Sequence, residues 1–175
     1  MIDTPTIDPR TLRGVLGRFA TGVVVVTTRT DDGLAIGMTV NSFCSVSLEP
    51  PLVLFCVSRA SQLHPLFTGA SHFAVNVLSE AQRKVSLSFA RPGRDRFKDL
   101  TPDTGRLGAP VLPDALAVVE CTRASIVEAG DHDIVIGRVV AMSADEQGLP
   151  DPLVFYGGAY RRLDPQHADW WTAFA

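Results

Sequence analysis

A run of β-branched residues near the N-terminus constrains the fold more than any other feature of this sequence. Gly22 to Thr30 contains four consecutive valines and three threonines, a composition typical of a strand that is buried on both faces. Asp31-Asp32-Gly33 then forms a turn signal, and residues 34–40 return as a second strand. The segment therefore predicts an antiparallel hairpin at the start of a β-rich fold.

More strands and a few helices follow, mostly with short connections. Apolar runs predict strands at residues 52–57, 72–78, 116–123 (with an extension to 127), 133–142 and 153–156. Helices are predicted after an Asp8 cap with Pro9 in the first turn, at residues 61–70, and from Ser79 to Phe89, where Ser79 and Gln82 have capping-box spacing. Residues 41–48 are interpreted as a polar connection, and residues 90–114 as a long surface loop.

We expect one mainly β domain over residues 1–175, with its core at about 12–163. Many strands joined by short turns, with two or three helices, indicate an antiparallel barrel with peripheral helices. The sequence lacks the βαβ alternation of a Rossmann fold, and no GxGxxG follows a strand. A nucleotide cofactor would therefore have to be bound in another way.

Charge and cysteine content narrow the possible partners. The formal net charge is −3, so a broad nucleic-acid surface is not expected. Cys44, Cys56 and Cys121 are widely spaced, which fits reduced thiols better than a disulfide framework or a CxxC metal site. No apolar run reaches the ~20 residues that span a bilayer, and no signal-peptide pattern is present. We expect a cytoplasmic protein that binds neither nucleic acid nor membrane.

Polar segments stand at several predicted strand and helix ends. Residues 37–47 offer backbone N–H groups and Thr, Asn and Ser side chains, which suit an isoalloxazine edge or a phosphate, but also an ordinary turn. Residues 58–62 fit an anion site at a helix N-terminus or a capped helix with an exposed Arg. Arg91 suits either a phosphate contact or a solvated helix-end cation. Residue types alone leave these alternatives open.

Two later segments are equally ambiguous. His132 lies in a predicted tight turn between acids, where it suits a nicotinamide amide or no ligand at all. Residues 155–161 place two glycines between aromatic residues, which either admit a planar ring or form a glycine bulge. Neither GxSxG nor HExxH occurs, and the histidines are scattered, so hydrolysis and metal chemistry are not expected.

Taken together, these segments resemble the flavin reductase family, which has the FMN-binding split β-barrel fold. The resemblance extends from about Leu12 to Leu163. It depends on the order and spacing of FATGVVVVT at 19–27, TVNSFCSVS at 39–47 with the prolines at 50 and 51, FAVNVL at 73–78, and GDH at 130–132. It implies an antiparallel, Greek-key split barrel and a reductase component of a two-component flavin monooxygenase.

The resemblance also implies roles for individual residues. The flavin ring and ribityl chain would be lined by Met38, Thr39, Val40, Asn41 and Ser42, with Cys56 and Val57 beside the ring and Phe89 among the cofactor contacts. The ribityl hydroxyls and phosphate would be served by Ser45, Ser58, Ser61, Gln62 and Arg91. The nicotinamide would meet His132, the candidate catalytic residue, and Phe155, Tyr156, Gly157, Gly158 and Tyr160. Cys44 departs from the family, which often has a Ser or another small residue there, so one hydrogen bond would be weaker.

The activity implied by the resemblance is reduction of FMN or FAD by NADH or NADPH. The protein would hold nicotinamide and flavin face to face, and hydride transfer needs no acid or base with a shifted pKa. Reduced flavin would leave for a separate oxygenase, so exchangeable binding and a homodimer with flavin sites near its interface are expected. NADH is favoured because no clear basic cluster suits a 2′-phosphate. The alternatives are a flavin-retaining split-barrel oxidase of the pyridoxamine-phosphate oxidase kind, and a non-catalytic flavin- or haem-binding module.

Overall fold

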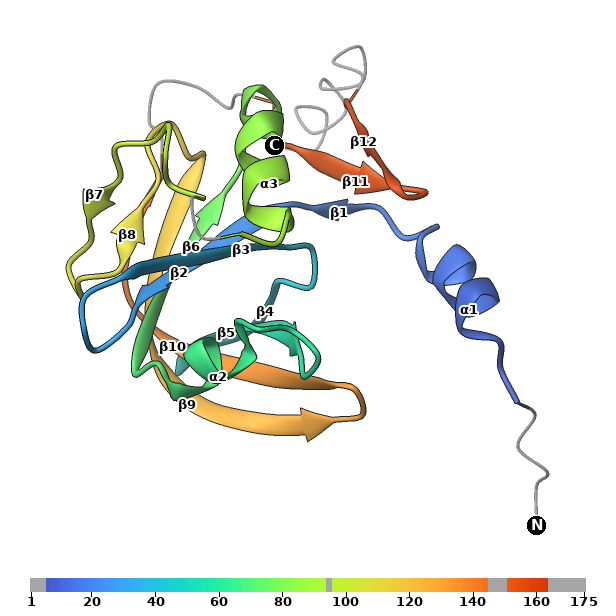
Figure 1. Ribbon diagram of the computed structural model, residues 1–175, viewed down its shortest axis with the longest axis horizontal. Coiled ribbons are helices and arrows are strands. Elements are labelled where there is room, and N and C mark those ends of the chain that lie inside the picture. Colours follow the sequence, from blue (N-terminus) through green and yellow to red (C-terminus); the bar gives the residue numbers. More distant parts are fainter. Residues whose placement is uncertain (1–5, 94–95, 145–150, 164–175) are drawn as a thin grey trace.

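A computed structural model describes residues 6–93, 96–144 and 151–163 of the protein. Its main feature within these residues is a seven-stranded sheet in which every strand pair is antiparallel (Figure 1). The strands follow one another across the sheet as β3 (Ala35–Val40), β2 (Val24–Arg29), β6 (His72–Val77), β9 (Ala117–Ala129), β10 (His132–Ala144), β5 (Pro51–Ser58) and β4 (Cys44–Leu48). The prediction of a mainly β, antiparallel fold is confirmed.

The valine-rich segment forms the predicted hairpin with one difference. β2 pairs with β3 from Val24–Val40 to Arg29–Ala35, and the turn is closed by the N–H of Gly33 donating to the carbonyl of Thr30. The predicted strand from Gly22 is divided, because β1 (Thr21–Gly22) leaves the main sheet and pairs with β11 (Val154–Tyr156). A local run of valines does not reveal that its first residues change partner.

The sheet curls so that its two sides approach each other. β9 and β10 are each 13 residues long, and their pairing carries register shifts between Ile136 and Gly137 and between Val139 and Ala141. Such bulges bend a strand and increase its twist. β3 and β5 stand five positions apart in the strand order, yet their ends line the same cavity. The open order with curled sides matches the split barrel that the resemblance implies.

The helices lie at the periphery of the sheet (Figure 1). α1 (Pro9–Leu16) begins at the predicted cap, where the N–H of Thr11 donates to Asp8 Oδ2 at 2.8 Å. α2 (His64–Gly69) follows β5, and a 3-10 turn (Glu80–Gln82) leads directly into α3 (Arg83–Ala90). The Gln82 side chain accepts the N–H of Ser79 at 3.0 Å, as the capping-box spacing predicts. No helix among the described residues is both long and apolar enough to cross a membrane.

Two sequence-based expectations about connections are wrong, and one further strand was not predicted. Residues 44–48, expected in a polar turn, form the edge strand β4, which is stabilised by pairing with β5. The expected loop at 90–114 contains the short pair β7 (Asp103–Thr104) and β8 (Pro110–Val111). Gly157 and Gly158, with φ of 60° and 77°, form a hairpin turn into the unpredicted strand β12 (Ala159–Arg161).

The core has two main parts, one on each face of the sheet. Inside the curl, Phe55 packs edge-on against Phe67 and Phe73, with ring centroids 5.8 and 5.1 Å apart. Outside it, α3 covers the sheet, and Phe89 and Leu153 are buried there. Because both faces of β2 are covered, its valines are buried throughout, as the sequence predicts.

A fully buried asparagine fastens a neighbouring segment to this sheet. The Asn76 amide nitrogen donates to the carbonyl of Val25 at 3.0 Å and to Thr27 Oγ1 at 3.1 Å. Its oxygen accepts the N–H of Leu112 at 2.8 Å. Buried polar groups are costly unless they are paired, and all three bonds are made here. In the FAVNVL motif, Asn76 therefore has a structural role.

Candidate functional site

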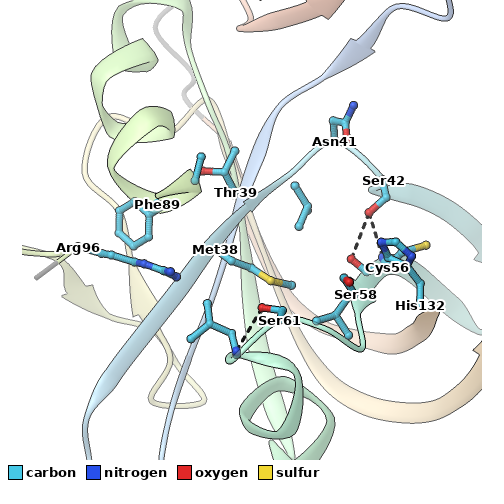
Figure 2. Close-up of a pocket in the computed structure, with 14 residues that line it drawn as sticks. Met38, Thr39, Asn41, Ser42, Cys56, Ser58, Ser61, Phe89, Arg96 and His132 are labelled. Carbon is cyan, nitrogen blue, oxygen red and sulfur yellow. Dashed lines mark hydrogen bonds between the residues drawn. The ribbon is translucent and has the colours of Figure 1, made fainter. Parts of the chain in front are cut away.

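A cavity of about 340 Å³ lies where β3 and β5 end, at the point to which the curl of the sheet brings them (Figure 2). Its walls come from strand ends, the turns that follow them and the end of α3: Met38, Thr39, Val40, Asn41, Ser42, Cys56, Val57, Ser58, Ser61, Leu63, Phe89, Ala90, Arg96 and His132. The size is in the range of small-molecule sites, which combine apolar walls with a few polar groups. The cavity is therefore the candidate site of this protein.

One wall is shaped by the contact between the turn after β3 and the end of β5. Ser42 Oγ accepts the N–H of Cys56 at 3.0 Å and lies 3.4 Å from the carbonyl oxygen of the same residue. A hydroxyl both accepts and donates, so Ser42 can satisfy both backbone groups of Cys56. This arrangement holds the end of β3 against β5 and leaves the Cys56 thiol half-buried at the cavity.

His132 lies at the same end of the cavity as Ser42 and Cys56 (Figure 2). It is the first residue of β10 and pairs with Ser58 of β5, so its place follows from the strand register. Its Nδ1 is 2.8 Å from Asp131 Oδ1. When Nδ1 donates to this carboxylate, Nε2 is left as an acceptor for a ligand. The same bond keeps the pKa of Asp131 below its usual range.

Arg96 and Phe89 form another part of the wall and lie side by side in Figure 2. Phe89 reaches the cavity because β3 carries a glycine beside it: a methyl group on Gly37 would be 2.5 Å from Phe89 Cε1. Phe97 packs edge-on against Phe89 with ring centroids 4.8 Å apart, which holds the neighbouring Arg96 inward. One Arg96 Nη nitrogen donates to the carbonyl of Gly37 at 2.6 Å.

Arg96 has unused capacity for an anion. Its Nε is buried without a hydrogen-bond partner, and no carboxylate among the described residues forms an ion pair with it. Burial lowers the pKa of the guanidinium, which nevertheless keeps its charge because an arginine pKa begins far above neutrality. Buried donors left unpaired in a protein are rare, and a bound anion would satisfy this one.

A smaller recess of about 180 Å³ adjoins the cavity along the end of β3. It shares Thr39, Val40, Asn41 and Ala90 with the cavity and adds Val23, Phe155 and Tyr160. Tyr160 is fixed from the side of α3, because its hydroxyl is 2.7 Å from Ser86 Oγ and the Arg83 guanidinium lies over its ring. The recess offers aromatic surface and little charge.

The structure gathers most, but not all, of the residues that the sequence singles out. Those in the cavity wall are Met38, Thr39, Val40, Asn41, Ser42, Cys56, Val57, Ser58, Ser61, Phe89 and His132. Phe155 and Tyr160 line the recess instead, so they do not share a wall with His132. Outside both linings are Ser45, Gln62, Arg91, Tyr156, Gly157 and Gly158. Their proposed contacts stay predictions.

Sequence reasoning missed Arg96, Leu63, Ala90 and Val23. Arg96 is the most consequential of these because it is charged. The family resemblance implies that Arg91 contacts the ribityl phosphate, but its side chain is exposed in the structure. Residue type cannot separate the two arginines, and the packing of Phe97 on Phe89 is what turns the second one toward the cavity.

Comparisons with known proteins match this chain over nearly its whole length. The model of the flavin reductase like domain family matches residues 16–164. FMN reductase (NADH) SmoA of Agrobacterium fabrum is 50% identical over 157 residues, which are 90% of this chain and 87% of that protein. Reductase subunit HsaB of a flavin-dependent monooxygenase from Mycobacterium tuberculosis is 42% identical, over 91% of this chain and 85% of the subunit.

Solved structures of similar proteins have the same architecture. The NADH:FAD oxidoreductase SgcE6 of Streptomyces globisporus, in complex with NAD and FAD fragments, superposes with a TM-score of 0.85 at 38% identity. The match covers 94% of this chain and 99% of that one. Nitrilotriacetate monooxygenase component B of Mycobacterium thermoresistibile superposes with a TM-score of 0.86 at 37% identity, over 90% of this chain and 88% of the other.

Proposed function

Because this chain belongs to the flavin reductase like domain family, we propose that its strand-end cavity is where a flavin is reduced by NADH. The protein is an NADH-dependent flavin oxidoreductase, of the type that serves a separate monooxygenase component. The observation that carries the placement is the cavity itself. It combines apolar walls, strand-end backbone groups, an imidazole and an arginine with a buried donor that none of the described residues pairs with.

The cavity residues fit a flavin in chemistry as well as in size. We place the isoalloxazine between the end of β3 and the end of β5, against Val40 and Val57, with backbone groups and Ser42 near its polar edge. The ribityl phosphate is assigned to Arg96, because a planar guanidinium binds phosphate with paired N–H groups. Bound flavin supplies the ring that accepts the hydride.

His132 is proposed to orient the nicotinamide. With Nδ1 bonded to Asp131, Nε2 can accept a hydrogen bond from the carboxamide N–H₂. This fixes one edge of the dihydronicotinamide ring and raises the fraction of encounters that lead to transfer. No side chain has to give or take a proton during the hydride step. The apolar part of the cavity wall would exclude water from the reacting rings.

The direct test is steady-state oxidation of NADH and NADPH with FMN, FAD and riboflavin in turn. We expect turnover with NADH, and little flavin retained on gel filtration. His132→Ala should raise the KM for NADH several-fold and the KM for flavin much less, since about 0.5–1.5 kcal/mol of one hydrogen bond is lost. His132→Gln, which retains an acceptor, should recover part of it. A tightly retained flavin with poor NADH oxidation would refute the proposal and favour the oxidase alternative.

Reduced flavin is proposed to leave the cavity for an oxygenase. HsaB is a reductase subunit of a flavin-dependent monooxygenase, which supports the same arrangement for this chain. Exchange requires that bound flavin dissociate within one turnover. Mixing the protein with NADH, flavin and a flavin-dependent oxygenase should therefore give product at a rate set by the free reduced flavin.

We also propose that the protein is a homodimer in which α1 packs on the second copy. No residue of α1 is buried in the single chain, and Val15, Leu16 and the following Phe19 are 63%, 63% and 78% exposed. In Figure 1, α1 lies away from the seven-stranded sheet. Exposed apolar clusters of this kind mark interfaces. Light scattering should give twice the chain mass, and Val15→Asp with Leu16→Asp should give the monomer.

The cellular location is proposed to be the cytoplasm. Cys44, Cys56 and Cys121 are all free in the structure, which suits a reducing compartment. NADH, the electron donor of this reaction, is regenerated in the same compartment. Fractionation of cells that express the chain should recover the activity with the cytosolic enzymes.

A further inference from the structure

A buried carboxylate stands directly behind the candidate site. Asp133 follows His132 on β10, and its side chain is 10% exposed. One of its oxygens accepts from Arg59 Nε at 2.8 Å, and the other is 2.8 Å from His64 Nε2. Asp133 itself does not line the cavity. Any influence on the reaction must therefore pass through its two partners.

These partners lie at the two ends of one short segment. Arg59 directly follows Ser58, and His64 directly follows Leu63. The segment of residues 58–63 contributes Ser58, Ser61 and Leu63 to the cavity wall. Within the segment, the N–H of Leu63 donates to Ser61 Oγ at 3.2 Å. At the start of the segment, the backbone N–H of Arg59 donates to the carbonyl of Asp131, outside it, at 3.0 Å. One carboxylate therefore ties both ends of a cavity-lining loop to the strand that carries His132.

We propose that Asp133 is a positioning residue, which fixes the loop at residues 58–63 relative to His132 through Arg59 and His64. The inference rests on the proposed function, because it concerns the geometry of the same flavin cavity. The loop is too short to form a helix of its own before α2, and its backbone makes few bonds to the sheet. A loop of this kind needs side-chain anchors to hold its serines in one place.

The chemistry of the cluster suits this role. Both donors favour the ionised carboxylate, and His64, followed by Arg59, lowers the pKa of Asp133. The charge is therefore present throughout the range in which the enzyme would work. Arg59 has a second acidic partner in Glu128 at 3.1 Å, but Glu128 is 83% exposed. Solvent screens an exposed pair strongly, so Glu128 cannot replace Asp133.

The test compares Asp133→Asn with two controls in the full-length protein. Flavin Kd is measured by quenching of FMN fluorescence, and kcat is measured at saturating FMN and NADH. Asp133→Asn should raise the Kd for FMN about tenfold, because the hydrogen bonds from Arg59 and His64 that hold the loop are lost or weakened. The value of kcat should change much less. Asp133→Glu should recover part of the affinity, because it keeps the charge.

The controls separate positioning from loss of stability. Glu128→Gln removes the exposed partner of the same arginine and should leave Kd unchanged. Glu120→Gln alters a buried carboxylate on β9 that accepts the N–H of Leu107 away from the cavity, so it should lower Tm without changing Kd. His64→Ala should raise Kd in the same direction as Asp133→Asn, and the double variant should be no worse than Asp133→Asn alone. Additive effects would overturn the proposal, as would an unchanged Kd in Asp133→Asn.

A readout without flavin distinguishes this proposal from the proposed function. Hydrogen exchange of the ligand-free protein should become faster at the amides of residues 59–64 in Asp133→Asn and in His64→Ala, and remain unchanged in β2 and β6. Equal exchange in wild type and variants would refute the anchoring. Should wild type fail to bind any flavin, the proposed function falls, and the exchange result still decides whether Asp133 holds the loop. If Asp133→Asn does not fold, His64→Ala carries both measurements.

Discussion

Replacing Arg96 tests the assignment of the flavin phosphate more sharply than any other change. Arg96 contributes a guanidinium to the cavity, donates one hydrogen bond to the carbonyl of Gly37 and has a buried Nε that no described residue accepts from. Arg96→Ala removes the charge and all of these donors. Riboflavin has the same ring and ribityl chain as FMN but no phosphate. The ratio of the two affinities therefore isolates the phosphate contact.

The expected magnitude follows from the type of bond. A hydrogen bond to a charged group contributes about 1.5–3 kcal/mol. Each 1.4 kcal/mol corresponds to about a tenfold change in Kd. Since the side chain is only half-buried, solvent weakens the contact, and we expect the lower part of this range. The Kd for FMN should rise about 10- to 30-fold in Arg96→Ala.

Fluorescence titration with FMN and with riboflavin is the assay. The Kd for riboflavin should change little, because only the bond from Arg96 to Gly37 is lost for that ligand. Arg96→Lys should recover part of the FMN affinity, because it keeps the charge but not the fork of donors. Lys98→Ala, which removes an exposed cation from the same segment, is the matched control and should have no effect.

The outcome also separates the two candidate arginines. Arg91 is the arginine that the family resemblance implies for the phosphate. Arg91→Ala should leave the ratio of FMN to riboflavin affinity near that of wild type, because its exposed side chain is outside the cavity lining. An equal loss of affinity for FMN and riboflavin in Arg96→Ala would mean that the arginine only shapes the wall. A loss specific to FMN in Arg91→Ala would refute the reasoning from the cavity.

Three other predictions concern thiols, a buried amide and acid stability. A maleimide should modify exposed Cys44 first and Cys56 more slowly, and bound FMN should protect Cys56. Cys121 should react only after unfolding, because burial raises its pKa to about 12. Mass spectrometry of the labelled peptides measures the three reactions. Asn76→Ala leaves buried partners unpaired and should lower the free energy of unfolding by about 2–4 kcal/mol in urea denaturation. Asp133 has a lowered pKa in the folded state, so its stabilising contribution is complete above its ordinary pKa and is lost as the pH falls through the lowered value. The Tm difference between wild type and Asp133→Asn should therefore be present at neutral pH and disappear in acid.

Each of these has a result that contradicts it. Rapid labelling of Cys121 in the native protein would mean that β9 opens more readily than its burial implies. An unchanged urea midpoint in Asn76→Ala would show that water replaces the three hydrogen bonds. A Tm difference for Asp133→Asn that persists at low pH would mean that its charge is not the source of the stabilisation.

Local sequence patterns predicted helix caps and hairpins correctly where residues close together in the sequence decide the conformation. The Asp8 cap, the Gln82 contact to Ser79 and the hairpin of β2 and β3 all depend on residues within a few positions of each other. Predictions were wrong where a distant partner decides the structure. The predicted strand from Gly22 is divided because β1 pairs with β11, about 130 positions later in the chain.

The candidate site also combines residues that the sequence predicts with residues that only the folded structure brings into it. The polar residues at the end of β3 and the GDH turn are found from the sequence through the order and spacing of the motifs that resemble the flavin reductase family, since their residue types alone also fit ordinary turns. Arg96 does not stand out, since its inward position depends on Phe97 packing against Phe89. The link from Asp133 to Arg59 and His64 also joins residues about 70 positions apart. No spacing rule in one sequence predicts such a contact.

Hydrophobic pattern and turn chemistry are properties of neighbouring residues, and they sufficed to predict a mainly β, antiparallel protein, while the order of its motifs resembles the flavin reductase family. The curl of the sheet, the cavity between β3 and β5 and the inward-facing arginine depend on contacts between segments far apart in the chain. Those contacts are chosen by packing of the whole core, whose free energy is shared among many side chains. For that reason only the folded chain decides which of several similar polar residues meet at one site.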